Sequence, residues 1–204
     1  MAGRIFLLSP ASCSGRRAHL VFNPKAGFPL ARRLREPAGA PLGEVFSFLS
    51  GLYFRGKLTY ACAFARPPET SAGVFIITAN AGLLPADEPV TLARLRRFAR
   101  VNIDVSEARY RRPLARAARA LAAAAGEDCE VVLLGSIASA KYVEILGKVF
   151  AERLLFPGEF VGRGDMSRGG LMLRCAREGR ELEYRPVVGA VRHGKRPPKL
   201  ERLR

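Results

Sequence analysis

Residues 130–154, EVVLLGSIASAKYVEILGKVFAERL, contain the pattern that decides the fold. The run from Val131 to Leu134 is apolar and partly β-branched, which is typical of a strand buried on both faces. Gly135 ends this strand, and apolar residues then recur at helical spacing. The stretch therefore predicts a strand, a tight turn and a helix. The apolar positions of the helix are Val143, Leu146, Val149, Phe150 and Leu154.

The turn in this stretch has the residues of an anion-binding site. Backbone amides exposed at a helix N-terminus attract phosphate or carboxylate, and the hydroxyl of Ser139 can cap the helix. The alternative is an ordinary strand-to-helix turn without a ligand. The candidate phosphate-binding residues here are Ser136, Ser139, Lys141 and Tyr142.

The remaining patterns predict an α/β fold with a mostly parallel central sheet flanked by helices, a C-terminal β-hairpin and a basic tail. Residues 1–191 are expected to form one domain and residues 192–204 the tail. Residues 23–43 predict a long loop or a helix with irregular ends. The other expected elements are strands at 4–8 and 73–78, helical segments at 44–64, 90–101 and 113–126, and a hairpin that pairs 171–175 with 181–187.

The chain is strongly basic, with 34 Lys and Arg residues against 18 Asp and Glu residues and a formal net charge of +16. Such an excess favours a polyanionic partner, with nucleic acid first and an anionic membrane second. No segment reaches the length of a membrane span, so a membrane is not expected as a partner. The pattern does not indicate an oligomeric state.

The cysteines predict neither a metal site nor disulfide bonds. Cys13, Cys62, Cys129 and Cys175 lie far apart without a CxxC pair, and the chain has only two histidines. Zinc ligands are spaced differently, so no metal and no cofactor are expected. Widely spaced cysteines without a secretory signal are typical of a reduced, cytoplasmic protein.

Three further segments provide candidates for binding nucleic acid. The first predicted strand runs into residues 9–17, SPASCSGRR, where small hydroxyl residues precede two arginines. Aromatic and basic residues alternate in 53–57, a combination that stacks on bases and holds phosphates, although aromatic rings in the core with cations reaching water explain it equally well. Residues 160–170, FVGRGDMSRGG, predict a glycine-rich loop, with or without a ligand. The candidates in these segments are Ser14, Arg16, Arg17, Tyr53, Arg55, Lys57, Arg163 and Arg168.

Five short blocks are spread along most of the chain: LSPASCSG at 8–15, SGLYFRGKLTYA at 50–61, FIITANAGLLPADEPV at 75–90, VVLLGSIASAKYVEIL at 131–146 and GRGDMSRGG at 162–170. In this order they resemble the YaaA-type peroxide-stress family and a related group of uncharacterised bacterial domains. The fourth block contains Ser139 and Tyr142 in an S-x-x-Y pattern, and the last contains Arg163 and Arg168 in an RG-x-M-x-R pattern. The insert at 23–43 and the basic tail depart from the family.

The resemblance implies an α/β protein linked to DNA, with remote likeness to uracil-DNA-glycosylase folds. Loops at the strand ends would then form one pocket for a flipped base. In that pocket Asn80 would contact a base edge and Asp165 would act as an acid or base. The alternative for Asp165 is an ion pair with Arg163 or Arg168. Cys13 is a third catalytic candidate if nearby cations lower its pKa, although no histidine partner is evident.

Three functions are compatible with these patterns. The first is a nucleic-acid-binding protein, with DNA favoured over RNA, that has a base- or nucleotide-sized pocket and processes bases. The second is an enzyme that acts on a small nucleotide or nucleoside, with the positive charge serving to attract it. The third is a non-catalytic, stress-protective DNA binder. A steep salt dependence of binding to the polymer favours the first and third over the second.

Overall fold

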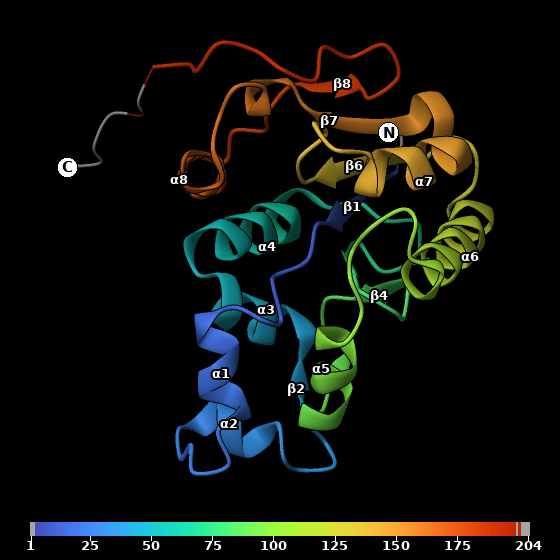
Figure 1. Cartoon of the computed structure of the whole chain (residues 1–204). Helices are drawn as coiled ribbons and strands as arrows, with labels where there is room; N and C mark the ends of the chain where they lie inside the picture. Colours follow the sequence, from blue (N-terminus) through green and yellow to red (C-terminus); the bar gives the residue numbers. More distant parts are fainter. Residues whose placement is uncertain (1–2, 199, 201–204) are drawn as a thin grey trace.

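A computed structural model describes residues 3–198 and residue 200 of the chain. Its centre is a six-stranded sheet with the strand order β4-β3-β1-β6-β7-β8 (Figure 1). The four inner strands are parallel, and each edge strand is antiparallel to its neighbour. The strands are β1 (Arg4–Leu8), β3 (Val74–Ile77), β4 (Leu83–Pro85), β6 (Glu130–Leu134), β7 (Leu154–Pro157) and β8 (Tyr184–Pro186).

Helices cover both faces of this sheet. The pair α6 and α7 packs together on one side, and the pair α4 and α8 packs together on the other (Figure 1). The smaller helices α1, α2, α3 and α5 lie together below the sheet in Figure 1, beyond the end of β1. The helices are α1 (Arg16–Phe22), α2 (Pro29–Arg33), α3 (Leu42–Ser50), α4 (Leu52–Phe64), α5 (Leu92–Ala99), α6 (Ala108–Ala125), α7 (Ala140–Phe150) and α8 (Asp165–Glu178).

The remaining elements are short. Two 3₁₀ turns, η1 (Ala151–Arg153) and η2 (Gly158–Phe160), lie on either side of β7. A separate antiparallel pair is formed by β2 (Ala40–Pro41) and β5 (Pro89–Val90). Residues 23–43, expected as a loop or an irregular helix, contain α2 and β2. None of the described helices is long and apolar enough to cross a membrane.

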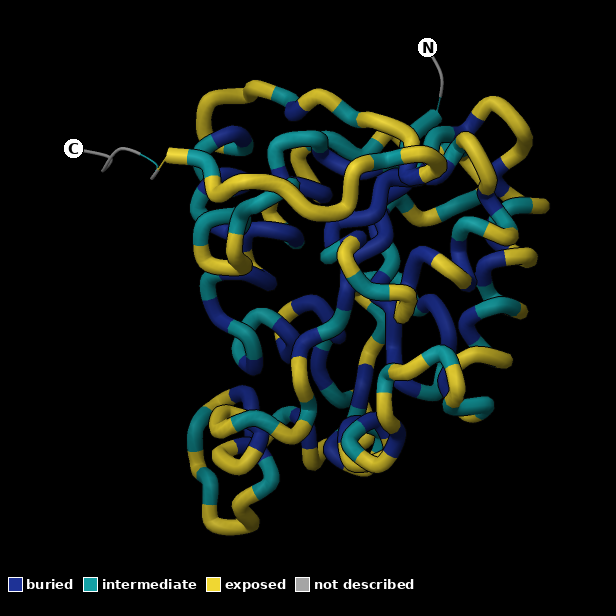
Figure 2. Tube along the Cα trace, turned by 45° about the horizontal axis from the view of Figure 1, so that its top comes forward, coloured by how far each residue is buried: buried dark blue, intermediate teal, exposed yellow. Residues whose placement is uncertain are grey.

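The predicted α/β fold is confirmed, and the strands β1 and β6 form its core. Residues 5–8 of β1 and 131–134 of β6 are fully buried, and buried segments run through the middle of the molecule in Figure 2. Both runs are continuously apolar because helices cover both faces of the sheet. The chain continues from β1 to β3 on one side, whereas β6 lies on the other side. The strand order therefore reverses at β1, and ligands of open α/β sheets bind outside the carboxyl ends of strands at such a point.

The predicted C-terminal hairpin is correct only in its second strand. Residues 171–175 lie inside α8, whereas β8 falls within the predicted strand 181–187 and pairs with β7. Leu171, Met172 and Cys175 are buried, a spacing that one face of a helix produces. The predicted glycine-rich loop at 160–170 is likewise shorter than expected, because α8 already begins at Asp165. Short apolar runs do not distinguish a strand from a helix segment.

Glycines allow α8 to approach α4 very closely. A Cβ atom on Gly56 of α4 would lie 2.5 Å from the carbonyl oxygen of Gly169 in α8. A Cβ atom on Gly169 would lie 2.8 Å from the Cα of Tyr53. Neither glycine has a positive φ, so here glycine serves the helix contact and not an unusual backbone conformation.

The described part of the basic tail lies against the domain. A Cβ atom on Gly162 would collide with the carbonyl of Lys195, and Arg163 donates a hydrogen bond to the carbonyl of Pro198 at 3.4 Å. Lys199 and residues 201–204 lie outside the described residues. The division into a domain at 1–191 and a tail stays a prediction.

We predict that Gly56→Ala destabilises the protein by about 1–3 kcal/mol, because the added methyl group has no room against the backbone of α8. Urea denaturation measures the change in the free energy of unfolding. Gly147→Ala in α7 is the matched control, since no atom lies within 4 Å of its added Cβ. The control is expected to gain up to about 1 kcal/mol from helix propensity. Equal stabilities of the two variants would contradict the close contact.

Candidate functional site

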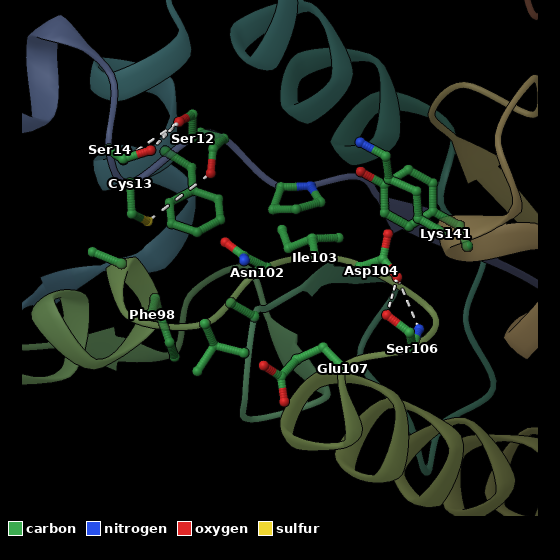
Figure 3. A pocket seen from close by; sticks show the side chains of 17 residues that line it. Ser12, Cys13, Ser14, Phe98, Asn102, Ile103, Asp104, Ser106, Glu107 and Lys141 are labelled. Atoms are coloured by element: carbon green, nitrogen blue, oxygen red, sulfur yellow. Dashed lines mark hydrogen bonds between the residues drawn. The ribbon is translucent and has the colours of Figure 1, made fainter.

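A cavity of about 780 Å³ lies at the carboxyl ends of β1 and β3 (Figure 3). Most of its lining comes from the loop that follows β1, the end of α5 with the connection to α6, and the first turn of α7. Phe46 of α3 and Ala79, which follows β3, complete it. This volume is typical of a small-molecule or nucleotide site. The cavity adjoins the point at which the strand order reverses, so the fold places it where α/β proteins bind ligands.

Two carboxylates lie on the wall formed between α5 and α6. One oxygen of Asp104, Oδ1, accepts hydrogen bonds from the amide and the hydroxyl of Ser106 at 2.9 and 2.6 Å. These bonds lower the pKa of Asp104, so the carboxylate is ionised at neutral pH. Glu107 accepts bonds from both the amide and the guanidinium of Arg109, which lowers its pKa to about 2.

The first turn of α7 supplies hydrogen-bond donors to the same cavity. Lys141 and Tyr142 both line it, and the positive charge of Lys141 contributes to the lowered pKa of Asp104. Figure 3 shows Lys141 and Asp104 at the same end of the cavity. The carbonyl of Lys141 accepts a 2.8 Å hydrogen bond from the buried Tyr110 of α6, which fixes the start of α7. Acceptors and donors therefore stand close together at this end.

The structure brings four of the predicted site residues into the cavity: Cys13, Ser14, Lys141 and Tyr142. Burial raises the pKa of Cys13 to about 12, whereas a nucleophilic cysteine requires a lowered pKa. The expectation that cations activate this thiol is therefore wrong. The hydroxyl of Ser14 lies 3.2 Å from that of Ser12 at the opposite end of the cavity (Figure 3).

Ser136 and Ser139 lie between β6 and α7. The hydroxyl of Ser136 accepts a hydrogen bond from the amide of Ala138 at 3.3 Å. Ser139 occupies the N-cap position of α7 but its side chain makes no capping hydrogen bond, contrary to the expectation from sequence. The amides of the first turn of α7 therefore have no side-chain cap.

Asp165 and Asn80 lie outside the lining of the cavity. The carboxylate of Asp165 is 66% exposed and lies 3.6 Å from Arg168, so the ion-pair alternative describes it. The guanidinium of Arg168 also donates to the carbonyl of Phe160 at 2.9 Å. The side chain of Asn80 donates to the carbonyl of Arg97 at 3.0 Å and lines a second hollow of about 620 Å³, which shares Phe98 and Val101 with the cavity.

The predicted aromatic and basic segment at 53–57 is largely internal. Tyr53 is buried, and its hydroxyl has no hydrogen-bond partner among the described residues. Lys57 is 1% exposed, so its ammonium group is not available to a phosphate and does not reach the solvent. Arg55 remains exposed and lines a third hollow together with Arg17, whose guanidinium donates to the carbonyl of Phe48 at 3.0 Å.

Lys57 fixes the end of the central strand. Its ammonium donates to the carbonyl and the hydroxyl of Ser9 at 2.5 and 2.9 Å, immediately before the loop that lines the cavity. It also lies 4.3 Å from the centre of the Tyr53 ring. Burial lowers the pKa of Lys57 to about 7, and the charge of Asp165 opposes this shift while that of Arg168 adds to it.

Arg16 and Arg163, which were predicted together with Arg168 to hold phosphates, have different surroundings. Arg16 is exposed at the start of α1 and forms no ion pair within the described part of the chain. Arg163 donates to the hydroxyl of Ser167 at 3.3 Å and lies beside the tail. Neither arginine lines the cavity.

The acidic wall of the cavity was not predicted, because residues 102–112 lie between the expected helical segments at 90–101 and 113–126 and were interpreted as a linker. The residues concerned include Asn102, Asp104, Ser106 and Glu107. The available signal was Asp104 two residues before Ser106, since Asp side chains bind the backbone two residues ahead in turns. In the described residues no group of three or more Cys, His, Asp or Glu side chains could hold a metal ion.

Comparisons of the chain with protein-family models, with curated proteins and with solved structures found no match. The resemblance to the YaaA-type family therefore stays a prediction that rests on the short sequence blocks.

We predict that Lys57 makes the stability of the protein depend on pH. In the unfolded chain Lys57 keeps its proton up to its ordinary pKa of 10.5, whereas in the folded protein its pKa is about 7. Between these values the unfolded state binds more protons, so the free energy of unfolding rises with pH by up to about 1.4 kcal/mol per unit. Lys57→Met should remove this rise, and urea denaturation at a series of pH values measures it.

The matched control for this experiment is Lys148→Met, because the ammonium of Lys148 is exposed and paired only with Glu144. Its pH profile should follow that of the wild type, since a surface ion pair contributes little. Tyrosines and cysteines whose pKa burial raises affect all three proteins equally, so the differences between profiles isolate Lys57. Parallel profiles for the wild type and Lys57→Met would contradict the prediction.

Proposed function

We propose that the protein binds nucleic acid, DNA in preference to RNA, and receives a nucleobase or nucleotide in the cavity beside the reversal of strand order. The observation that carries the proposal is a set of exposed arginines of α5 and α6 that have no side-chain partner among the described residues. A basic surface of this kind binds phosphates through charge, and each contact releases counterions. The preference for DNA comes from the resemblance to the YaaA-type family.

These arginines lie on α5 and α6, and we call them the α5–α6 arginines. The apolar residues of α5, Leu92, Leu95 and Phe98, are buried against the domain, as the sequence predicted. The polar face therefore points to solvent. On α6 the arginines follow each other at spacings of four and three residues, which places them on one helix face. The set consists of Arg97, Arg100, Arg112, Arg116 and Arg119.

None of the α5–α6 arginines forms an ion pair or a side-chain hydrogen bond within the described residues. By contrast, Arg94 on α5 pairs with Glu88 at 2.7 Å, and Arg109 on α6 pairs with Glu107. The second hollow, which adjoins the cavity, lies between the two helices and is lined by Arg97. Arg112 and Arg119 line a further hollow between α6 and α7, together with Glu144 and Lys148. A polyanion that contacts Arg97 would therefore pass next to the cavity.

The carboxylates in the cavity favour a binding mode in which the base and the phosphates of one nucleotide contact different surfaces of the protein. Asp104 and Glu107 repel phosphate, whereas the α5–α6 arginines attract it. A nucleotide therefore fits best with its base in the cavity and its phosphates outside. The free cysteines in the structure agree with a reducing compartment, and we propose the cytoplasm as the location of the protein.

We predict that replacing Arg112, Arg116 and Arg119 together by Gln weakens binding to double- and single-stranded DNA. The slope of log K against log salt should fall by about 0.9 for each phosphate contact that is lost. Fluorescence anisotropy over a salt series measures both quantities. The control replaces Arg177, Arg180 and Arg185 by Gln, since it removes the same charge from the last turn of α8, from the segment that follows it and from β8. Unlike the α5–α6 arginines, Arg180 and Arg185 pair with Glu178 and Glu183.

The outcomes of this experiment separate the three functions. An equal loss in both triple variants would assign binding to net charge alone and contradict the proposed surface. Weak binding to every polymer, with tight binding of a mononucleotide, would favour the enzyme that acts on small nucleotides. Mass spectrometry of the same samples detects released bases, which distinguishes a base-processing protein from a non-catalytic DNA binder.

A further inference from the structure

We infer that the cavity selects guanine, which it binds through the free oxygen of Asp104 and the ammonium of Lys141. This inference rests on the proposal that the cavity receives a base, and it names which base fits. Asp104 and Lys141 lie at the end of the cavity where the connection between α5 and α6 meets α7.

The acceptor at this end is the second oxygen of Asp104. Its first oxygen is held by the amide and hydroxyl of Ser106, which orients the carboxylate (Figure 3). The second oxygen has no hydrogen bond within the described residues. An ionised carboxylate only accepts hydrogen bonds, so this oxygen requires N–H or O–H donors on the ligand. The carboxylate of Glu107 is already occupied by Arg109.

The donors at this end come from α7. The ammonium of Lys141 forms no ion pair or hydrogen bond among the residues that the structure describes, and its charge acts on Asp104. An ammonium only donates hydrogen bonds, so it requires an acceptor on the ligand, next to the donors that Asp104 needs. Tyr142 adds a hydroxyl and an aromatic edge to the same wall. The cavity thus calls for adjoining donors and an acceptor on one ligand edge.

Among the common bases, guanine presents this arrangement on its Watson–Crick edge. Its N1–H and 2-amino groups are two adjacent donors, and O6 is the acceptor beside them. Uracil and thymine have a single donor between two carbonyl oxygens, which a carboxylate repels. Cytosine and adenine offer one amino donor beside a ring nitrogen that accepts. They can therefore satisfy Lys141 but supply only one hydrogen bond to the free oxygen of Asp104, which can accept two. Only guanine places two donors toward Asp104 and a carbonyl toward Lys141.

The opposite charges also explain why the recognised group is a base and not a phosphate. A phosphate at Lys141 would lie close to the carboxylate of Asp104, and the repulsion would offset the attraction of the lysine. A neutral base avoids this repulsion. Its donors and acceptor engage both side chains, and charged hydrogen bonds of this type are the stronger class.

The test is calorimetric titration of the full-length protein with guanosine, inosine, adenosine, cytidine and uridine. These nucleosides carry no phosphate, so the α5–α6 arginines do not contribute. Inosine differs from guanosine only by the missing 2-amino group. We expect guanosine to bind at least about tenfold more tightly than inosine and than the other nucleosides, because a site built around hydrogen bonds rejects analogues that lack them.

The variants test the two side chains. Asp104→Asn replaces an acceptor oxygen by an amino donor and should abolish the preference for guanosine over inosine. Lys141→Met should weaken guanosine binding about tenfold and keep that preference. Asp104 and Lys141 are exposed, so neither change disturbs the core. Asp128→Asn is the matched control, since this exposed carboxylate precedes the amino end of β6, whereas the cavity lies at the carboxyl ends of the strands, and it should bind guanosine as the wild type does.

Equal binding of guanosine and inosine would overturn the inference, as would a preference for another nucleoside or the absence of guanosine binding. An unchanged guanosine preference in Asp104→Asn would do the same. In each of these cases the titrations with DNA over a salt series still test the proposed function independently. DNA binding that depends on Arg112, Arg116 and Arg119 would leave the proposed function standing without the choice of guanine.

Discussion

The ammonium of Lys57 holds the carboxyl end of the central strand, and the cavity depends on that contact. It binds the carbonyl and hydroxyl of Ser9 from α4, so helix and sheet are joined where β1 ends. The next residues form one wall of the cavity. A buried amine without a contacting carboxylate costs stability, which its lowered pKa expresses. The close approach of α8 at Gly56 and Gly169 covers α4 from outside and keeps water from this amine.

Charge is divided between the cavity and the surface around it. The excess of basic residues resides on exposed helix faces such as that of α6, whereas the cavity contains Asp104, Glu107 and Lys141. Net charge alone predicts a polyanion as partner but does not say what enters the cavity. The carboxylates add that information, because they exclude phosphate and require donors. The ligand that we propose, with an anionic backbone and a neutral base, matches this division of charge.

Most of the fold followed from patterns that local packing enforces. The runs at 4–8, 73–78 and 130–134 predicted three inner strands because strands buried on both faces are continuously apolar. The face of α5 with Leu92, Leu95 and Phe98 was equally readable. The predicted strand at 171–175 was wrong because a run of four apolar residues and one arginine fits either period, and contact with α4 decided for a helix. Pro113 lies in the second turn of α6 and not at its start, so the helix begins five residues before this proline, at Ala108.

The candidate site was less predictable because it depends on which loops meet. Ser14 and Lys141 come from two strand ends that the α/β fold brings together, so the pattern sufficed for them. Lys57 and Tyr53 were assigned to phosphate or base contacts because alternating rings and cations look the same on a surface and in a core. Their burial follows from α8, which comes more than a hundred residues later in the chain. Asp104 lies in a segment without periodicity, and it gains its role only because α5 and α6 place it opposite α7. The candidate site is thus assembled by long-range contacts, and the periodicity of a short sequence segment does not predict such contacts.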